Sequence, residues 1–304
     1  ADAVYLGWGS FNARRGAKNF SDGEFAEALA YCRVRGVRVF LTLNILLTDR
    51  ELPAALEAAR AASRLGADAV LVQDWGLLDL LRQALPDLPQ MSVFTSGGAR
   101  EAAADGCERV VIARECSAED TAAIIQNCPA EIEIFGHGAL CMCYSGQCAF
   151  SALVGGRSGN RGRCAQPCRL PYGVNEAAKN QRPLSLKDSC LASCLSEMAE
   201  AGTACLKIEG RMRRPSYVAA VTEIYARLLR ENRGPTAEEQ DTLERAFSRS
   251  GFTDAYWRGR KGPEMLGFRP ENAAAPAAPA SPRREKGRVP VRFRCRVKAE
   301  LPCA

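Results

Sequence analysis

Histidine is nearly absent from this sequence, which has 304 residues and a single histidine, His137. One imidazole excludes the HExxH helix of zinc peptidases and every metal site that needs two histidines. The chain also lacks the GxSxG elbow of serine hydrolases, and no GxGxxG loop follows a strand-like segment. Peptide hydrolysis and dinucleotide binding therefore have none of their usual sequence signatures here.

Long hydrophobic runs are missing as well. No apolar stretch approaches the roughly 18 residues that a membrane-spanning helix needs, and the first residues show no basic region leading into an apolar one. With 47% hydrophobic and 25% charged residues, the composition is that of a globular protein that can bury a core. We expect a cytoplasmic protein with no membrane partner.

Excess positive charge is confined to one end of the sequence. The net charge is +6, and residues 281–304 contain eight basic and two acidic residues, which already accounts for it. The preceding 280 residues balance at 33 basic and 33 acidic. The overall charge therefore does not predict nucleic-acid binding, and any anion site has to be argued from local residues.

Strand-like segments alternate with helix-like segments that carry capping boxes, as at Ser21 with Glu24. The segments with strand character are 3–7, 37–44, 69–73, 91–94, 109–114, 132–136 and 205–210. Near-continuous apolar strands joined by helical crossovers predict a parallel sheet that is covered on both faces. We predict an α/β fold, a TIM-type (β/α)8 barrel that lacks its first strand here, with an open doubly wound sheet as the alternative.

Three parts of the chain differ in composition. Residues 1–270 form the predicted barrel domain, with a cysteine-rich insertion at 137–202 between strands seven and eight and two helices that start near Pro215 and Thr236. Residues 271–288 are a basic linker rich in proline and alanine. In residues 289–304 the stretch VPVRFRCRV alternates apolar residues with arginine, which predicts the start of a truncated C-terminal β module.

Cysteine is as abundant as histidine is scarce, with 14 in the chain, eight of them between Cys141 and Cys205. The segment 137–170 carries five cysteines, four arginines and no acidic residue. A large chain without an export signal favours bound metal or reactive thiols over disulfides. Thiolates on a metal need positive surroundings, and the glycines of this segment let the backbone fold tightly around an inorganic centre.

A donor set of thiolates with little histidine suits an iron–sulfur cluster or a four-cysteine zinc site. Structural zinc usually shows paired CxxC knuckles, whereas the spacings here are CxC, CxxxC and six residues between Cys141 and Cys148. Cys190 and Cys194 follow at helical spacing. The spacing favours an iron–sulfur cluster, with structural zinc and reduced cysteines without a ligand role as the alternatives.

Three stretches of the sequence resemble one known family. The segment EIFGHGALCMCYSGQCAFSALVGGRSGNRGRCAQPCR, then LSLKDSC, then LKIEGRMRRPSYV are similar to the collagenase-like peptidase family of unassigned catalytic type (U-type, number thirty-two). The resemblance covers about residues 1–270, and the tail resembles the longer branch with an added C-terminal domain. Despite its name, the family is associated with iron–sulfur-dependent hydroxylation of pyrimidine bases in ribosomal or transfer RNA, and of the ubiquinone ring in another branch.

The resemblance implies a ligand set, a cofactor and partners. It implies a four-iron four-sulfur cluster held by Cys141, Cys148, Cys164 and Cys190, with Cys168 as the competitor for one position. It also implies ribosomal or transfer RNA as the partner and a small anionic co-substrate, with prephenate as the oxygen donor of the RNA branches. The family's peptidase label remains as the rival function.

Polar residues that follow barrel strands should share one face, because active sites of this fold lie at the C-terminal ends of its strands. The predicted catalytic residues are His137, Glu209 and Arg211. The predicted substrate-binding residues are Asn44, Arg157, Arg161 and Arg169. Arginines at these positions would hold a carboxylate or an RNA phosphate. For His137 the alternative is that it only packs beneath the cysteine loop.

Three functions follow from these residues. The first is an enzyme for redox hydroxylation of an RNA pyrimidine, the second is a peptidase, and the third is a non-catalytic RNA-binding factor with structural zinc. A cysteine peptidase would need His137 as the base and Cys141 or Cys143 as the nucleophile, and a cysteine that ligates a cluster cannot also be that nucleophile. We therefore expect the hydroxylation enzyme.

Overall fold

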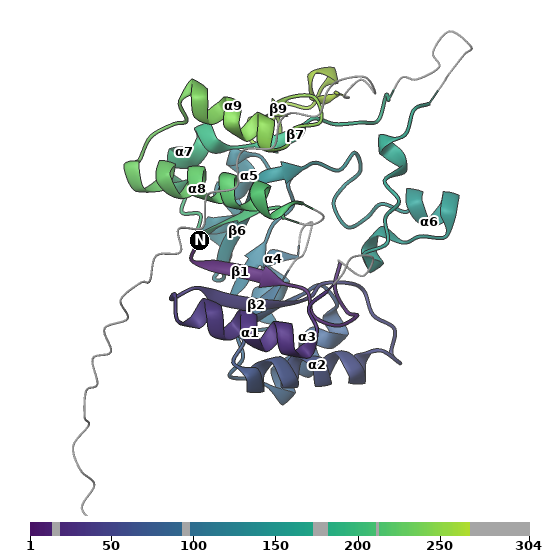
Figure 1. The fold of residues 1–304 in the computed structure, drawn as a ribbon. Helices are drawn as coiled ribbons and strands as arrows, with labels where there is room; N and C mark the ends of the chain where they lie inside the picture. The colour runs from purple at the N-terminus through teal and green to yellow at the C-terminus, as the bar shows by residue number, and fades with distance from the viewer. Residues whose placement is uncertain (14–18, 93–97, 173–181, 211–212, 268–304) are drawn as a thin grey trace, which may run out of the picture.

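The computed structural model describes residues 1–13, 19–92, 98–172, 182–210 and 213–267. One nine-stranded sheet with helices around it forms an α/β fold (Figure 1). No helix in these ranges is long and apolar enough to cross a membrane. The predicted linker at 271–288 and the predicted module at 289–304 lie outside the described residues.

Seven strands of the sheet run parallel, and they match the seven segments expected from the sequence. They are β1 (Ala3–Leu6), β2 (Arg38–Leu43), β3 (Ala69–Val72), β4 (Gln90–Ser92), β5 (Arg109–Val111), β6 (Glu131–Ala139) and β8 (Cys205–Ile208). Strands β1 to β6 pair in chain order and β8 pairs with β6. The α/β prediction is confirmed. Within the described ranges β1 pairs only with β2 and β8 only with β6, so the structure shows an open sheet and not a closed barrel.

Helices that follow the first five strands cover the convex face of this sheet. They are α1 (Asp22–Arg33), α2 (Leu52–Leu65), α3 (Trp75–Ala84), α4 (Ala99–Ala104) and α5 (Ala118–Asn127). The capping box of Ser21 with Glu24 opens α1, as the sequence predicts. Alternate β2 residues such as Leu41 pack against α1 and α2, because successive side chains of a strand point to opposite faces. This apolar contact holds the helices on the sheet.

The concave face of the sheet carries buried charge. Lys207 on β8 donates to Glu133 on β6 at 2.6 Å, and both side chains are almost fully buried. Arg109 on β5 approaches the same carboxylate at 3.5 Å, and the Lys207 ammonium lies 4.4 Å from the centre of the Tyr5 ring. The Tyr5 hydroxyl donates to the carbonyl of Ile208 at 3.0 Å. Polar side-chain contacts therefore connect β1 and β8, which form no backbone hydrogen bonds with each other as strands in the described ranges.

The segment between β6 and β8 contains the cysteine-rich insertion, where the sequence predicts it. Its elements are α6 (Phe150–Gly155), short 3-10 turns at Gly159–Arg161, Pro167–Arg169 and Ala192–Cys194, β7 (Asp188–Cys190) and α7 (Leu195–Glu200). Strand β7 runs antiparallel to β6, with Cys190 opposite His137. The helical spacing of Cys190 and Cys194 was misleading, because pairing with a distant strand fixes Cys190 in β7.

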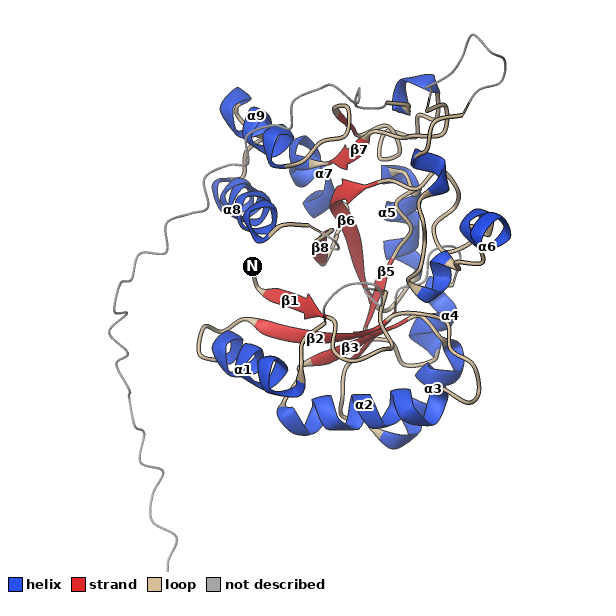
Figure 2. Ribbon diagram, turned by 45° about the vertical axis from the view of Figure 1, so that its right-hand side comes forward, coloured by secondary structure: helices blue, strands red, loops and turns tan. Residues whose placement is uncertain are grey.

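Two helices and then a short strand follow β8. Helices α8 (Pro215–Glu231) and α9 (Ala237–Ala246) begin where the sequence predicts, α9 with a capping box of Thr236 and Glu239. Strand β9 (Phe252–Thr253) pairs with β7. Figure 2 shows β1 to β3 with α1 to α3 on one side of the molecule, and β6 to β8 with α7 to α9 on the other. The insertion extends past the carboxyl ends of the strands.

Candidate functional site at the carboxyl ends of the strands

An ion pair fastens the insertion to the loop between β2 and α2. Arg161 donates to both carboxylate oxygens of Glu51, the shorter contact being 2.7 Å, and to the carbonyl of Leu46 at 2.8 Å. The Leu46 amide donates in turn to the carbonyl of Asn160. Hydrogen bonds from Arg161 hold the pKa of Glu51 at about 2. The predicted ligand-binding residue Arg161 is thus engaged in docking the insertion.

A second contact joins the insertion to the loop after β1. Gly162 has a φ of +71°, and a Cβ there would come within 2.8 Å of the Ala13 backbone, so only glycine fits. The Ala13 amide donates to the side-chain oxygen of Asn44 at 3.0 Å. Arg157 donates to the carbonyl of Arg163 within its own loop. Asn44 and Arg157, both predicted to bind substrate, therefore make structural hydrogen bonds.

Five thiols of the insertion lie near one another. We call them the insertion thiols: Cys141, Cys143, Cys148, Cys164 and Cys168. The Cys168 thiol lies within electrostatic range of Cys141, Cys164 and Cys148, and Cys141 lies within range of Cys164. Cys143 interacts directly with Cys148. The structure thus brings together three of the four predicted ligands together with their competitor, Cys168.

Arg169 holds this group against the sheet. Its guanidinium donates to the carbonyls of Leu140 and Leu186, and to the Ser185 hydroxyl at 3.0 Å. Leu140 directly precedes Cys141, and Arg169 directly follows Cys168. The predicted substrate-binding Arg169 therefore ties the two ends of the thiol group to each other, and its charge lowers the pKa of Cys141 against the larger, raising effect of burial.

The chemistry of the donors fits an iron–sulfur cluster. Four thiols and an arginine-rich, acid-free loop suit an anionic iron–sulfur centre, and the Gln166 amide donates to the Cys164 sulfur at 3.3 Å. In the described ranges no three histidine, cysteine or acidic side chains converge closely enough to hold a single metal ion.

Cys190 lies apart from the insertion thiols. Its side chain is buried in the core between β6 and α8, and its sulfur lies 3.7 Å from the Tyr225 hydroxyl. The neighbouring thiol is Cys194. The predicted role of Cys190 as a cluster ligand remains a prediction, with Cys168 as its competitor.

His137 lies in the same core and is 1% exposed. The Tyr225 hydroxyl gives its one proton to the carbonyl of Gly136 at 2.8 Å, so His137 Nδ1, at 3.2 Å, must be the donor to the Tyr225 oxygen. Burial, with a smaller contribution from Arg213, lowers the pKa of His137 to about 3. His137 is therefore packed in the core, and its predicted catalytic role remains a prediction.

Glu209, at the end of β8, pairs with an arginine that the sequence analysis did not single out. Arg114 donates to Glu209 at 2.8 Å and to the carbonyl of Ala139 at 2.6 Å, and it stacks 3.9 Å from the centre of the Phe135 ring. A Cβ at Gly138 would lie 2.3 Å from the Glu209 Cβ, so glycine makes room for this carboxylate. Arg114 ends the predicted strand 109–114, and the strand-end rule could have found it. Arg211 lies outside the described residues.

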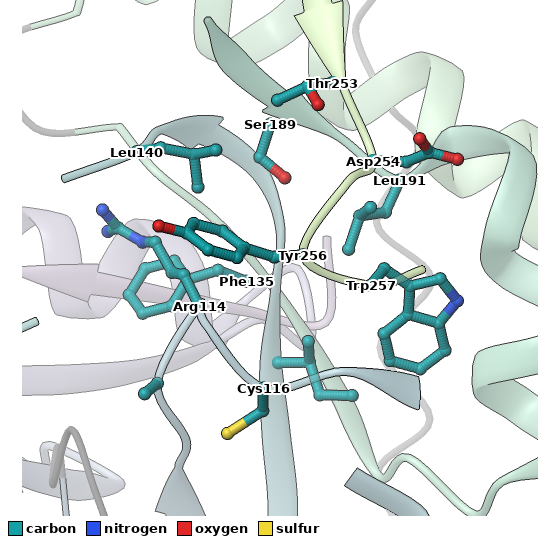
Figure 3. A pocket seen from close by; sticks show the side chains of 12 residues that line it. Arg114, Cys116, Phe135, Leu140, Ser189, Leu191, Thr253, Asp254, Tyr256 and Trp257 are labelled. Atoms are coloured by element: carbon teal, nitrogen blue, oxygen red, sulfur yellow. The ribbon is translucent and has the colours of Figure 1, made fainter. Parts of the chain in front are cut away.

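A pocket opens beside Arg114 (Figure 3). Its cavity volume is about 10 Å³, which holds about one water molecule, and Phe135, Tyr256 and Trp257 contribute aromatic surface to its lining. Ser189 contributes a hydroxyl. The Tyr256 hydroxyl lies within electrostatic range of Cys141, so the pocket adjoins the insertion thiols. An arginine, aromatic side chains and a thiol group thus meet at the carboxyl ends of β5 and β6.

Comparison with known proteins gives one family. The model described as peptidase family U32 matches residues 1–267. The 23S rRNA 5-hydroxycytidine C2501 synthase of Escherichia coli is 37% identical over 86% of this chain and 43% of its own length. The tRNA hydroxylation protein P1 of Bacillus subtilis is 30% identical over 88% of this chain and 68% of its own. A collagenase of Porphyromonas gingivalis is 29% identical over 86% of this chain and 69% of its own. The chain thus spans less than half of the rRNA synthase.

Proposed function

Because the chain belongs to peptidase family U32, we propose that it is an iron–sulfur-dependent enzyme that hydroxylates a pyrimidine base of ribosomal or transfer RNA. The observation that carries this proposal is the group of insertion thiols beside the Arg114 pocket, at the strand ends where this fold places its chemistry. The names of the rRNA and tRNA hydroxylation relatives support it.

The proposed ligands of a four-iron four-sulfur cluster are Cys141, Cys148, Cys164 and Cys168. When bound, the cluster would supply a redox-active iron site beside the pocket. Arg169 would keep the ligand loop against the sheet, and its charge would favour the thiolate form of Cys141. Prephenate, or another small carboxylate, is the proposed oxygen donor.

The pocket residues have separate proposed roles. Tyr256 would offer the ring face on which a planar base stacks, which is how proteins commonly hold unpaired RNA bases, whereas the Phe135 ring is already stacked with Arg114. Arg114, held by Glu209, presents a fixed positive charge next to them. Trp257, 3% exposed, also lines the pocket. The cavity is smaller than a base, so these residues would bind and orient one only after they move apart.

The collagenase name of one relative favours a peptidase as the second candidate. A cysteine peptidase needs a base in contact with a thiol of lowered pKa. His137 is buried against Tyr225, and the pocket thiol Cys116 has its pKa raised to about 11, chiefly by burial. Among the described residues, therefore, no thiol and imidazole form an activated pair, and hydroxylation is the better supported function.

The test is the RNA of cells that lack the gene encoding this chain. We expect one oxidised pyrimidine to disappear from ribosomal or transfer RNA, measured by nucleoside mass spectrometry, and the full-length gene to restore it. Cys148→Ser should not restore it, and Arg114→Gln should restore less than about a tenth, because it removes the charge at the pocket. Arg230→Gln, on the exposed face of α8, is the matched control and should restore it fully.

The opposite result is equally clear. An unchanged nucleoside profile, together with gelatin cleavage by purified protein that persists in Cys148→Ser, would assign the protein to the peptidases. An unchanged profile with stoichiometric zinc and no cleavage would instead support the non-catalytic RNA-binding factor.

A further inference from the structure

A buried carboxylate at the end of the sheet pairs with one arginine and has two more within electrostatic range. Asp188 on β7, 1% exposed, accepts hydrogen bonds from the backbone amide and the guanidinium of Arg249. Arg169 and Arg213 both lie within electrostatic range of Asp188 and of Arg249. The donors of Arg169 bind neutral groups. One carboxylate therefore faces three guanidinium groups, and two positive charges are left over.

Arg213 has no acidic partner among the described residues. Its guanidinium stacks 3.4 Å from the centre of the Phe247 ring, and its buried Nε has no hydrogen-bond partner among the residues that the structure describes. Glu209 lies within electrostatic range, but its carboxylate is paired with Arg114. A buried donor without an acceptor is costly, and such a donor on a charged group is rare in folded proteins. Burial and the charge of Arg249 accordingly lower the pKa of Arg213.

Tyr217 supplies a second orphaned group at the same place. The residue is 3% exposed, and its hydroxyl has no hydrogen-bond partner in the described part of the chain. Its ring centre lies 5.6 Å from the Arg213 guanidinium carbon. Tyr217 belongs to the first turn of α8, which has no acidic residue and no side-chain cap. The positive end of a helix therefore adds to the positive charge.

We propose that the carboxylate of a small organic acid binds between Arg213 and Tyr217. A carboxylate accepts from a guanidinium and a phenol at once, and it would neutralise the excess charge beside Asp188. Both donors are buried, so the ligand has to be small enough to enter as the surrounding side chains move, and a phosphate within a polynucleotide chain is not. The rings of Phe247 and Phe252, which lie near Tyr217 and His137, suit the carbon body of an organic acid better than a bare inorganic ion.

The site lies next to the insertion thiols. Arg169 is common to both, since its charge acts on Cys141 and lies within range of Arg249. This inference therefore rests on the proposed function and assigns the position of its small anionic co-substrate. It also moves that position away from the exposed loop around Arg157, whose guanidinium binds a carbonyl of its own loop.

Calorimetric titration of the purified protein tests the site without measuring hydroxylation. The probes are prephenate, phenylpyruvate and inorganic phosphate. Arg213→Gln should weaken prephenate binding roughly a hundredfold, because it removes a charged donor, and Tyr217→Phe roughly five- to tenfold, because it removes one hydrogen bond. Arg230→Gln should bind like the wild type.

Thermal unfolding without ligand separates binding from folding. Because the Tyr217 hydroxyl has no partner, Tyr217→Phe should leave the Tm of the free protein unchanged or raise it while the affinity falls. Prephenate affinity that is unchanged in both variants, or phosphate that binds as tightly as the carboxylates, would overturn the site. If Arg213→Gln and Tyr217→Phe keep prephenate affinity and also restore the RNA nucleoside in cells, the site fails while the proposed function stands.

Discussion

The insertion thiols and the thiols of the core are the same chemical group in opposite surroundings. Cys141 and Cys143 are exposed residues in a loop rich in arginine, whereas Cys190 and Cys194 are buried among apolar side chains. Burial raises the pKa of all four thiols, and arginine charge opposes this at Cys141 in the insertion and also at Cys194 in the core. Cysteine count and spacing alone do not distinguish ligands from packing residues. The element on which each cysteine lies makes that distinction.

Loss of iron is the largest effect that this comparison predicts. Cys148→Ser and Cys168→Ser should lose most of the bound iron and sulfide after anaerobic purification, because each removes one of the proposed cluster ligands. Cys190→Ser should keep the iron and instead lower the free energy of unfolding by roughly 1–2 kcal/mol, because it places a hydroxyl in an apolar core. Iron and sulfide analysis alongside chemical denaturation measures both.

The opposite iron contents in Cys168→Ser and Cys190→Ser would contradict this distinction between the two groups of thiols. Iron that persists in Cys168→Ser and disappears in Cys190→Ser would make Cys190 the fourth ligand, as the family resemblance implies. Cys32→Ser, in helix α1 far along the chain from the insertion, is the control and should keep its iron.

The core should also respond to pH through His137, whose pKa falls to about 3 in the folded protein. The unfolded chain takes up a proton near pH 6.5, whereas the folded protein does not, so stability is complete above that pH and decreases as the pH falls. Between pH 7 and pH 5 the wild type should lose roughly 2 kcal/mol more than His137→Asn, whose amide can still donate toward Tyr225. Urea unfolding at several pH values measures the difference, and parallel pH profiles would contradict it.

The docking of the insertion should depend on the ion pair of Arg161 with Glu51. Glu51→Gln should lower the free energy of unfolding by roughly 1 kcal/mol, because the pair is partly exposed and solvent screens it. The pKa of Glu51, lowered to about 2, implies that this contribution is complete above about pH 4.5 and is lost as the pH falls toward 2. Faster amide hydrogen exchange in residues 159–163 of Glu51→Gln would show that the ion pair stabilises this part of the insertion.

A matched variant guards against an indirect effect. Glu57→Gln removes a carboxylate from the exposed face of α2, where it pairs with Arg60, and should leave exchange in residues 159–163 unchanged. Equal exchange in both variants would mean that the pair does not hold the insertion.

The parallel strands and the helix starts could be predicted because their signals are local. Apolar runs such as 37–44 and the capping box at Thr236 fix an element without reference to the rest of the chain. Strand β7 could not be predicted, since three residues form a strand only through pairing with β6. Whether a barrel is open or closed depends on strand pairing across the whole sheet. Hydrophobic periodicity along the sequence carries no information about that pairing.

The candidate site was predicted in part for the same reason. The cysteine-rich loop is visible in the sequence because its residues are close in the chain. The positive charge of Arg157 and Arg161 predicts ligand binding. In the structure their guanidinium groups donate hydrogen bonds to other groups of the protein. Arg213 and Tyr217 were not singled out, because the absence of a partner for a buried donor is a property of packing alone.

Metal and sulfide analysis of the anaerobically purified protein tests the central claim most directly, since the proposed hydroxylation and the role of the insertion thiols both require a cluster. We expect a brown protein with about four iron and about four sulfide per chain, and loss of both in Cys148→Ser. One zinc per chain without sulfide, at the same content in a Cys148→Ser variant that still folds, would contradict the account.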